Sequence, residues 1–327
     1  MTKVIEQNHL LAWVQNQWSL PAIVEAEAVS GSSGQVLRLT CGDGRVVYLK
    51  QTDSAERMQR ITAIQEVLQQ HGVRVAVALP AAGGERWVTF ERQLYTLTNE
   101  LKGAIISELK PEIAAVYGQG LAKLHEGLRH MAIDHYPVMD FTEQLMGWAI
   151  PHCRAAGDSL GCLEELEAVL EEMVTAGIPR LAQLPQQLIH RDTHPGNMVL
   201  MDDGGVGFLD FEISVAGLRI FDLGYLCTSQ WISAYQDEQK RQDWLRLVEE
   251  ILRGYERAGR LPEAERDCLF YTMCGIQMIF TAYWQGEGRA DQAAINLEAL
   301  LALMRVRACL LQTLILKFNN SQADRTD

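Results

Sequence analysis

The first hundred residues combine two segments of helical periodicity with several short stretches in which apolar and polar residues alternate. Apolar residues at helical spacing predict an amphipathic helix over residues 6–17 and a second helix over residues 54–71, which Gly72 ends. Alternating patterns predict strands, and these cover residues 23–28, 35–41, 45–49, 73–79, 86–90 and 93–98. The chain is therefore expected to begin with a sheet of five or six strands and two helices.

Helical periodicity dominates the rest of the chain. It predicts helices over residues 111–129, 140–178, 218–227, 239–259, 263–285 and 292–316. One segment in the middle differs, because a buried strand end at Leu188-Ile189 leads into a loop that contains Pro195-Gly196. After this loop, residues 198–201 and 206–209 are predicted to form a hairpin around a turn of two aspartates and two glycines.

The loop and the hairpin carry polar residues in an order typical of phosphoryl transfer. Asn197 precedes the first hairpin strand and Asp210 follows the second, so strand pairing is expected to bring an amide oxygen close to a carboxylate. Mg²⁺ that carries the phosphates of a nucleotide prefers such oxygen ligands. Asp192 lies earlier on the same loop, where a carboxylate can accept the proton of an attacking hydroxyl. We therefore predict Asn197 and Asp210 as metal ligands and Asp192 as the catalytic base.

The pattern H-x-D-x-H-P-G-N, followed by D-F-E and then by F-D-L, resembles the aminoglycoside phosphotransferase and choline kinase family, small-molecule relatives of the protein kinases. The resemblance implies an α+β, two-lobed protein-kinase-like fold, with a small antiparallel-sheet N-lobe and a larger, mainly helical C-lobe. It places the nucleotide-binding N-lobe at residues 1–103, with a hinge at about residues 97–103. The C-lobe, with the catalytic loop and the substrate site, is expected over residues 104–327.

The same resemblance implies roles for further residues. Lys50, which ends the third predicted strand, corresponds to the lysine that holds the α- and β-phosphates of ATP. The loop between the first two strands is expected to approach these phosphates through small residues, namely Gly31, Ser32, Ser33 and Gly34. His190 and Asp222 are expected to support the catalytic loop. His194 is predicted to pack this loop or to donate to a phosphate, and Glu212 to assist a second metal, to meet a substrate cation or to serve structurally.

One position departs from the family pattern. Many relatives carry on the second helix a glutamate that pairs with the strand lysine, and the corresponding position here is Ile61. Glu56 and Glu66 lie five residues to either side, which is about 140° around a helix, so neither is expected to face inward. Gln65, one turn after Ile61, is the predicted alternative hydrogen-bond partner of Lys50.

Composition and charge exclude some classes of function. The 327 residues, of which 48% are apolar, are enough for two packed lobes, and a net charge of −13 argues against nucleic acid as a partner. No apolar run reaches the roughly 18 to 20 residues that span a bilayer, and the first nine residues lack the apolar segment of a signal peptide. We expect a cytoplasmic protein with no membrane partner. The seven cysteines contain no C-x-x-C pair and are expected to be free, mostly buried thiols.

Together these features predict an ATP- and Mg²⁺-dependent phosphotransferase that moves the γ-phosphate to a hydroxyl of a small molecule. D-F-E with a downstream R-I-F-D favours an amino alcohol such as choline or ethanolamine as the acceptor. The aromatic residues of the C-lobe helices are expected to be mostly core, with Tyr283-Trp284 as the first candidate for a cation-binding pair. An aminoglycoside or other antibiotic phosphotransferase, a homoserine kinase-like enzyme and a catalytically silent coat-type protein are the alternatives.

Overall fold

The structure is a computed structural model, and it describes residues 2–29 and 36–316. The chain forms two compact units, each of which is described by itself below. The first unit contains Met1–Gly103 and Gly207–Glu212, and the second contains Ala104–Val206 and Ile213–Asp327. The chain thus enters the first unit a second time, for six residues that include Asp210 and Glu212.

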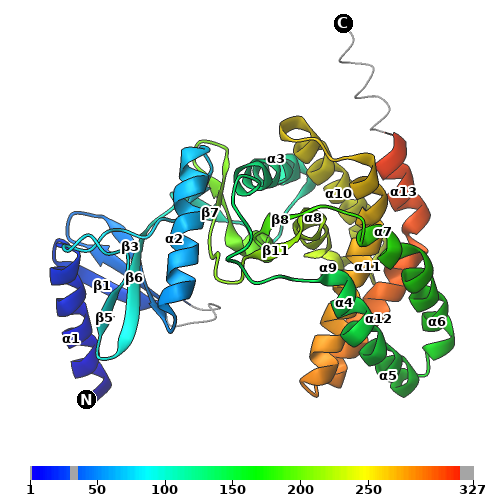
Figure 1. Cartoon of the computed structure of the whole chain (residues 1–327), viewed down its shortest axis with the longest axis horizontal. Helices are drawn as coiled ribbons and strands as arrows, with labels where there is room; N and C mark the ends of the chain where they lie inside the picture. The colour runs from blue at the N-terminus through cyan, green and yellow to red at the C-terminus, as the bar shows by residue number, and fades with distance from the viewer. Residues whose placement is uncertain (1, 30–35, 317–327) are drawn as a thin grey trace, which may run out of the picture. The chain divides into compact units, whose positions relative to one another are not determined.

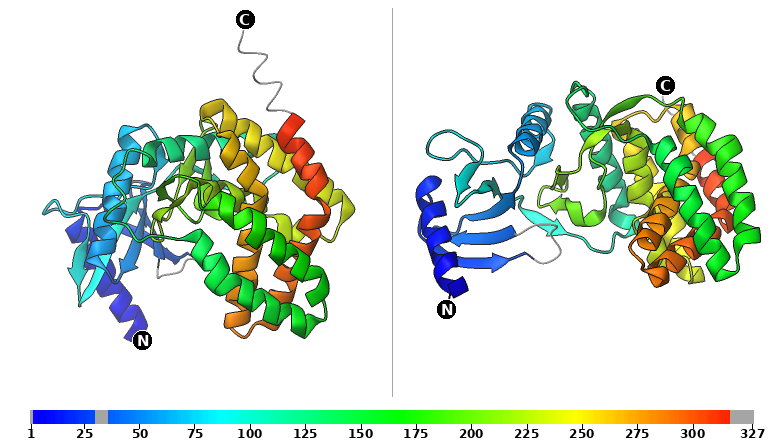
Figure 2. Two further views of the ribbon diagram at one scale, coloured as in Figure 1. Left: turned by 45° about the vertical axis from the view of Figure 1, so that its right-hand side comes forward. Right: turned by 60° about the horizontal axis from the view of Figure 1, so that its bottom comes forward.

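The first unit is built on a five-stranded sheet (Figures 1 and 2). Its strands occur in the order β1 (Ile23–Ala28), β2 (Val36–Cys41), β3 (Val46–Thr52), β6 (Gln93–Asn99) and β5 (Val88–Phe90), and each is antiparallel to its neighbours. α1 (Thr2–Gln17) packs on one face, where Val14 and Trp18 join Leu39, Leu49 and Leu97 in a buried apolar core. Lys50 lies in the central strand β3, between Val36 of β2 and Thr96 of β6.

α2 (Ala55–Gln70) lies on the side of the sheet away from α1 (Figures 1 and 2). The hydroxyl of Ser54 caps its first turn by accepting a hydrogen bond from the amide of Arg57 at 3.1 Å. Gly72 follows its end with a φ of 72°, a left-handed conformation that glycine adopts without steric cost. The predicted boundaries of this helix are therefore correct to within one residue.

The strand predicted over residues 73–79 is largely wrong. The only regular strand in this segment is β4 (Arg74–Val75), which pairs in parallel with β10 (Val206–Phe208). Residues 77–79 meet β6 only through an isolated antiparallel bridge between Ala78 and Thr98, where Leu79 N donates to Leu97 O at 2.7 Å. The amides of Val77 and Ala78 find side-chain acceptors, because Val77 N donates to Asn99 Oδ1 at 2.7 Å and Ala78 N donates to Gln65 Oε1 at 3.0 Å. Side-chain hydrogen bonds thus interrupt the strand ladder that the alternating pattern predicts and leave an isolated bridge.

The second unit is mainly helical and is organised around α3 (Pro111–Leu128) and α10 (Glu238–Ala258), which pack along each other. Two glycines permit this close approach. A Cβ atom on Gly118 would overlap the carbonyl oxygen of Ile251, and one on Gly254 would overlap that of Ala115. The remaining long helices are α8 (Arg219–Thr228), α11 (Glu263–Gly286), α12 (Ala290–Arg305) and α13 (Arg307–Leu316), with the short α9 (Trp231–Ala234) between α8 and α10.

The helical segment predicted over residues 140–178 is confirmed, and it is divided into several helices. The structure has α4 (Phe141–Gln144), a π-helical turn (Leu145–Ala149), α5 (Ile150–Leu160), α6 (Leu163–Glu172), a second π-helical turn (Met173–Gly177) and α7 (Ile178–Leu181). Pro151 and Pro179 follow the two π-helical turns, and because proline lacks an N–H, the regular hydrogen bond to the preceding turn cannot form. Gly161 ends α5 with a φ of 70°. Similarly, the helix predicted over residues 292–316 divides into α12 and α13 at Val306.

Short strands frame the catalytic loop of the second unit. β8 (Gln186–Ile189) pairs antiparallel with β11 (Val215–Leu218), and a 3₁₀ turn (Pro195–Asn197) leads into β9 (Met198–Met201). The predicted turn after β9 is confirmed, because Gly204 N donates to Met201 O and Met201 N donates to Gly205 O, both at 2.9 Å. β7 (Gly103–Ile105) lies at the change from the first unit to the second.

Two further expectations concern the whole chain. All seven cysteines are free, and five of them are buried, as predicted. Within the part of the chain that the structure describes, no helix has both the length and the apolar character needed to cross a membrane.

Candidate active site

Asp222 anchors the backbone of the catalytic loop in the second unit. Its carboxylate is fully buried and accepts hydrogen bonds from His190 N at 2.9 Å and from Arg191 N at 2.7 Å. Its own carbonyl oxygen accepts from Thr193 Oγ1 at 2.7 Å. Arg191 has a φ of 72°, a left-handed conformation that costs free energy in a residue with a Cβ atom. Asp222 therefore holds a strained backbone in place directly before Asp192.

A buried histidine completes the surroundings of this aspartate. His125 Nε2 lies 3.2 Å from Asp222 Oδ2, and His125 Nδ1 lies 2.8 Å from the hydroxyl of Tyr255. His125 is 1% exposed, and burial raises the pKa of the Tyr255 hydroxyl. These three side chains come from α3, α8 and α10. The packing of these helices therefore fixes the position of Asp222, and Asp222 in turn holds the backbone of the catalytic loop.

The carboxylate of Asp192 is oriented by Asn197. The amide nitrogen of Asn197 donates to Asp192 Oδ2 at 2.7 Å and to Asp192 O at 3.0 Å. Because both partners are acceptors, this atom must be the –NH₂ group, and Oδ1 of Asn197 is left to bind another cation or donor. The side-chain nitrogen of Asn197 thus orients Asp192, the predicted base. Its side-chain oxygen remains available to a metal, and oxygen is the ligand atom that Mg²⁺ prefers.

His194 approaches the other oxygen of Asp192. His194 Nδ1 accepts a hydrogen bond from Gly196 N at 3.0 Å, so a neutral His194 carries its proton on Nε2. This Nε2 lies 3.7 Å from Asp192 Oδ1. Burial raises the pKa of the Asp192 carboxyl, but His194, His190 and the hydrogen bond from Asn197 together outweigh burial, and the net pKa lies below its ordinary value of 3.8. Asp192 is therefore an ionised carboxylate at neutral pH.

Replacing His194 tests this arrangement. In His194→Gln the strongest stabilising partner of the Asp192 carboxylate is lost while its burial remains, so we expect the pKa of Asp192 to rise. The acid limb of the kcat/KM profile should move to higher pH, and the stability that the ionised carboxylate contributes should be lost at higher pH as the solution is acidified. The control is His9→Gln, which changes an exposed histidine of α1. An acid limb that stays at the wild-type pH would contradict the assignment.

Tyr225 belongs to the site and was not identified from the sequence. Burial, followed by the nearby charge of Asp192, raises the pKa of its hydroxyl, so the hydroxyl stays protonated and is a donor close to the Asp192 carboxylate. Its ring contacts those of Phe280 at 5.8 Å, Phe221 at 6.2 Å and His194 at 6.3 Å between centroids. The available signal was its spacing, because Tyr225 lies three residues after Asp222 on the same predicted helix.

In the first unit, Lys50 pairs with two carboxylates. Lys50 Nζ lies 3.2 Å from Asp210 Oδ1 and 3.0 Å from Glu212 Oε1, and the three side chains are between 18% and 30% exposed. Asp210 has a φ of 54°, and its Oδ1 also accepts from Glu212 N at 3.4 Å. The loop residues Gly31, Ser32, Ser33 and Gly34 lie outside the residues that the structure describes.

The prediction that Gln65 is the hydrogen-bond partner of Lys50 is wrong. Gln65 is 5% exposed, and its side-chain oxygen accepts from the amide of Ala78. Ile61 is 7% exposed and packs inside the unit, so the position where relatives carry a glutamate is apolar here. The acceptors of the Lys50 ammonium come instead from the D-F-E segment.

The aromatic residues of the C-terminal helices are mostly core, as predicted. Those on or directly after α9, α10 and α11 with less than a tenth of their surface exposed are Trp231, Tyr235, Trp244, Tyr255, Phe270 and Tyr271. Of the candidate cation-binding pair, Tyr283 is 47% exposed, whereas the ring of Trp284 already has the guanidinium of Arg289 over it at 5.4 Å. The guanidinium of Arg289 therefore covers one face of the Trp284 indole, a ring that was a candidate for binding a cationic substrate.

Comparison with known protein sequences identifies the family of this chain. Residues 25–265 match the model of the phosphotransferase enzyme family. A homoserine kinase of Gluconacetobacter diazotrophicus is 28% identical over 255 residues, which cover 75% of this chain and 74% of the relative. A homoserine kinase of Gluconobacter oxydans is 24% identical over 285 residues, which cover 86% of this chain and 87% of the relative.

Solved structures share the fold. An amicoumacin kinase, solved in complex with AMP-PNP, Ca²⁺ and Ami, has a TM-score of 0.69 at 15% identity, over 92% of this chain and 96% of that chain. An aminoglycoside phosphotransferase from Alicyclobacillus acidocaldarius has a TM-score of 0.67 at 17% identity, over 90% of this chain and 93% of that chain. The predicted α+β, protein-kinase-like fold is confirmed.

Proposed function

Because this chain belongs to the phosphotransferase enzyme family, we propose that it transfers the γ-phosphate of ATP to the hydroxyl of homoserine or of a closely similar amino acid. That it is an ATP-dependent phosphotransferase acting on a small molecule follows from the family. The choice of acceptor is supported by the homoserine kinases, which match over most of their length and at higher identity than the antibiotic kinases of known structure.

The observation that carries the catalytic part of the proposal is the setting of Asp192. Its carboxylate is ionised and is oriented by Asn197, His194 and Tyr225. A carboxylate with a lowered pKa is a weak base, which suits a loose phosphoryl-transfer transition state, where orienting the hydroxyl matters more than early removal of its proton. As the new O–P bond forms and the bond to the leaving ADP breaks, the hydroxyl proton passes to Asp192.

The remaining residues are proposed to hold the nucleotide. Lys50 supplies a cation for the α- and β-phosphates, and Gly31 to Gly34 supply backbone amides. Asn197 and Asp210 offer oxygen donors, a set that fits a hard cation such as Mg²⁺. When bound, Mg²⁺ neutralises phosphate charge. Among the described residues, no group of three or more histidines, cysteines, aspartates and glutamates is placed to hold a metal.

The other acceptors considered from the sequence have less support. The amino-alcohol prediction rests on the D-F-E triplet and its downstream motif, and it stays a prediction. The antibiotic kinases resemble this chain at 17% identity or less, which is evidence for the fold alone. A catalytically silent coat-type member of the family has less support, because Lys50, Asp192, Asn197 and Asp210 are all present.

An acceptor screen tests the proposal. Purified protein with ATP and Mg²⁺ is offered homoserine, serine, choline, ethanolamine and kanamycin, and ADP release is measured with Asp192→Asn as the blank. We expect homoserine to give the highest kcat/KM, at least about tenfold above the others, because serine lacks one of its methylene groups and choline, ethanolamine and kanamycin lack its carboxylate. Turnover of another acceptor without turnover of homoserine would overturn the assignment of the substrate while leaving the assignment of the base testable.

A further inference from the structure

We propose that Glu212 is the positioning residue for Lys50, in place of the glutamate that relatives carry on the helix corresponding to α2. The proposal rests on the proposed role of Lys50 in binding the phosphates of ATP. Its basis is the contact between Lys50 Nζ and Glu212 Oε1, which are 3.0 Å apart, with both side chains at least four-fifths buried. Asp210 Oδ1, at 3.2 Å, is the second acceptor of the same ammonium.

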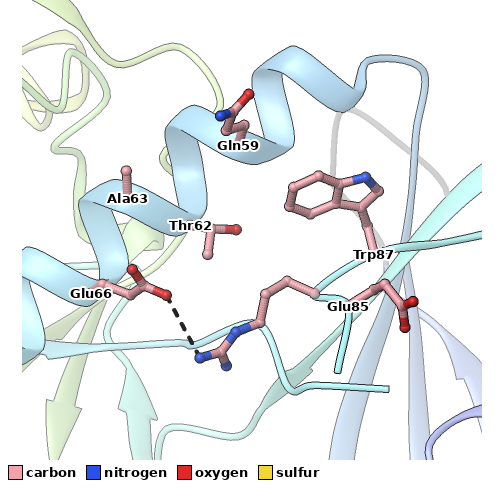
Figure 3. Close-up of a pocket in the computed structure, with 7 residues that line it drawn as sticks. Gln59, Thr62, Ala63, Glu66, Glu85 and Trp87 are labelled. Carbon is pink, nitrogen blue, oxygen red and sulfur yellow. Dashed lines mark ion pairs between the residues drawn. The ribbon is translucent and has the colours of Figure 1, made fainter. Parts of the chain in front are cut away.

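No carboxylate of α2 takes this position. Ile61, at the family position, is apolar and 7% exposed. Glu56 pairs with Arg60 at 2.7 Å one turn along the helix. Glu66 is directed to Arg86, 3.7 Å away, across a cavity of about 430 Å³ between α2 and the segment before β5 (Figure 3). Both acidic side chains of α2 thus form ion pairs with arginines, and the D-F-E segment supplies the carboxylate that pairs with Lys50.

The local structure explains why residue 212 reaches the lysine. β10 pairs with β4 and brings residues 207–212 into the first unit. Phe211 is 3% exposed and fixes this segment in the unit, while Asp210 and Glu212, on either side of it, both point to Lys50 Nζ. Glu212, two residues after Asp210, is therefore the ion-pair partner of Lys50 that a glutamate on the corresponding helix provides in relatives. This accounts for the apolar residue at position 61 of α2.

Asp210 and Glu212, the two acceptors of the Lys50 ammonium, are expected to differ once nucleotide is bound. Asp210 is a proposed metal ligand, so its charge is shared with the cation in the loaded enzyme. A lysine ammonium has three donors, and it can keep one carboxylate while it donates to phosphate oxygens. Glu212 is then the acceptor that keeps Lys50 in place during transfer.

The test is a double-mutant cycle with Lys50→Met, Glu212→Gln and the double variant, and with Glu56→Gln as the matched control. We expect Glu212→Gln to lower kcat about tenfold without changing the Mg²⁺ concentration at half-maximal rate, because a mispositioned lysine loses its transition-state contact. In the Lys50→Met background the same change should cost less than about twofold, because the partner is absent. Glu56→Gln should match wild type.

A second readout does not depend on the acceptor. Pulse acetylation of the nucleotide-free protein with acetic anhydride, followed by mass spectrometry, should label Lys50 about fivefold faster in Glu212→Gln than in wild type, because a charge-assisted contact is lost. ATP should slow this labelling in wild type. If ATP gave no protection, the proposed role of Lys50 would fail. If protection held but Glu212→Gln raised the Mg²⁺ requirement, with effects additive to those of Lys50→Met, Glu212 would be a metal ligand and the positioning role would be refuted.

Discussion

Asp192→Asn is expected to lower kcat about 10³-fold, within the range that positioned acid–base groups contribute, and to leave the fold intact. Asparagine keeps an oxygen that can accept from Asn197, so the loop should retain its conformation, but it cannot take up the hydroxyl proton. The KM for ATP should change less than about threefold, because the phosphates are proposed to be held by other groups. Steady-state ADP release and thermal melting measure both effects.

The matched control for this change is Asp202→Asn. Asp202 is an exposed residue of the turn that follows β9, so it undergoes the same chemical substitution close in sequence but away from the site. We expect its kcat to stay within twofold of wild type, as for most exposed substitutions. A kcat of Asp192→Asn within about tenfold of wild type would rule out Asp192 as the base.

Asp222→Ala is expected to lower the free energy of unfolding by about 3–5 kcal/mol, the range found when one partner of a buried ionic network is removed. The backbone amides of His190 and Arg191 lose their acceptor inside the protein, and the imidazole of His125 loses its carboxylate. Urea unfolding followed by circular dichroism measures the loss. The strained conformation of Arg191 should relax as well, so the folded fraction should also lose activity.

Two further variants separate the parts of this effect. Asp267→Ala removes an exposed aspartate of α11, and its free energy of unfolding should stay within about 0.5 kcal/mol of wild type. Asp222→Asn keeps one acceptor oxygen and should lose less stability than Asp222→Ala. If Asp222→Ala were as stable as wild type, the view that this aspartate braces the loop would be wrong.

Much of the fold could be predicted from the sequence, because the hydrophobic pattern and the residues at the ends of each element indicate the same structure. β1, β2, β3 and β6 alternate in hydrophobicity, and α2 carries a Ser54 cap and a Gly72 stop, so each was predicted to within a few residues. The catalytic loop was likewise marked by Pro195-Gly196. Where residues far apart in the sequence compete for a hydrogen bond, the pattern misled, as in the strand expected over residues 73–79.

The site divides in the same way. The sequence by itself determined the residue types and their order, Lys50, Asp192, Asn197 and Asp210, because phosphoryl transfer needs a cation, a carboxylate and oxygen ligands, and the last three follow one another along one loop and hairpin. Only the tertiary structure decided the partners. Tyr225 reaches Asp192, and Glu212 reaches Lys50 across 162 positions of sequence, because helix packing and the β4–β10 pairing set those distances, and no local periodicity encodes them.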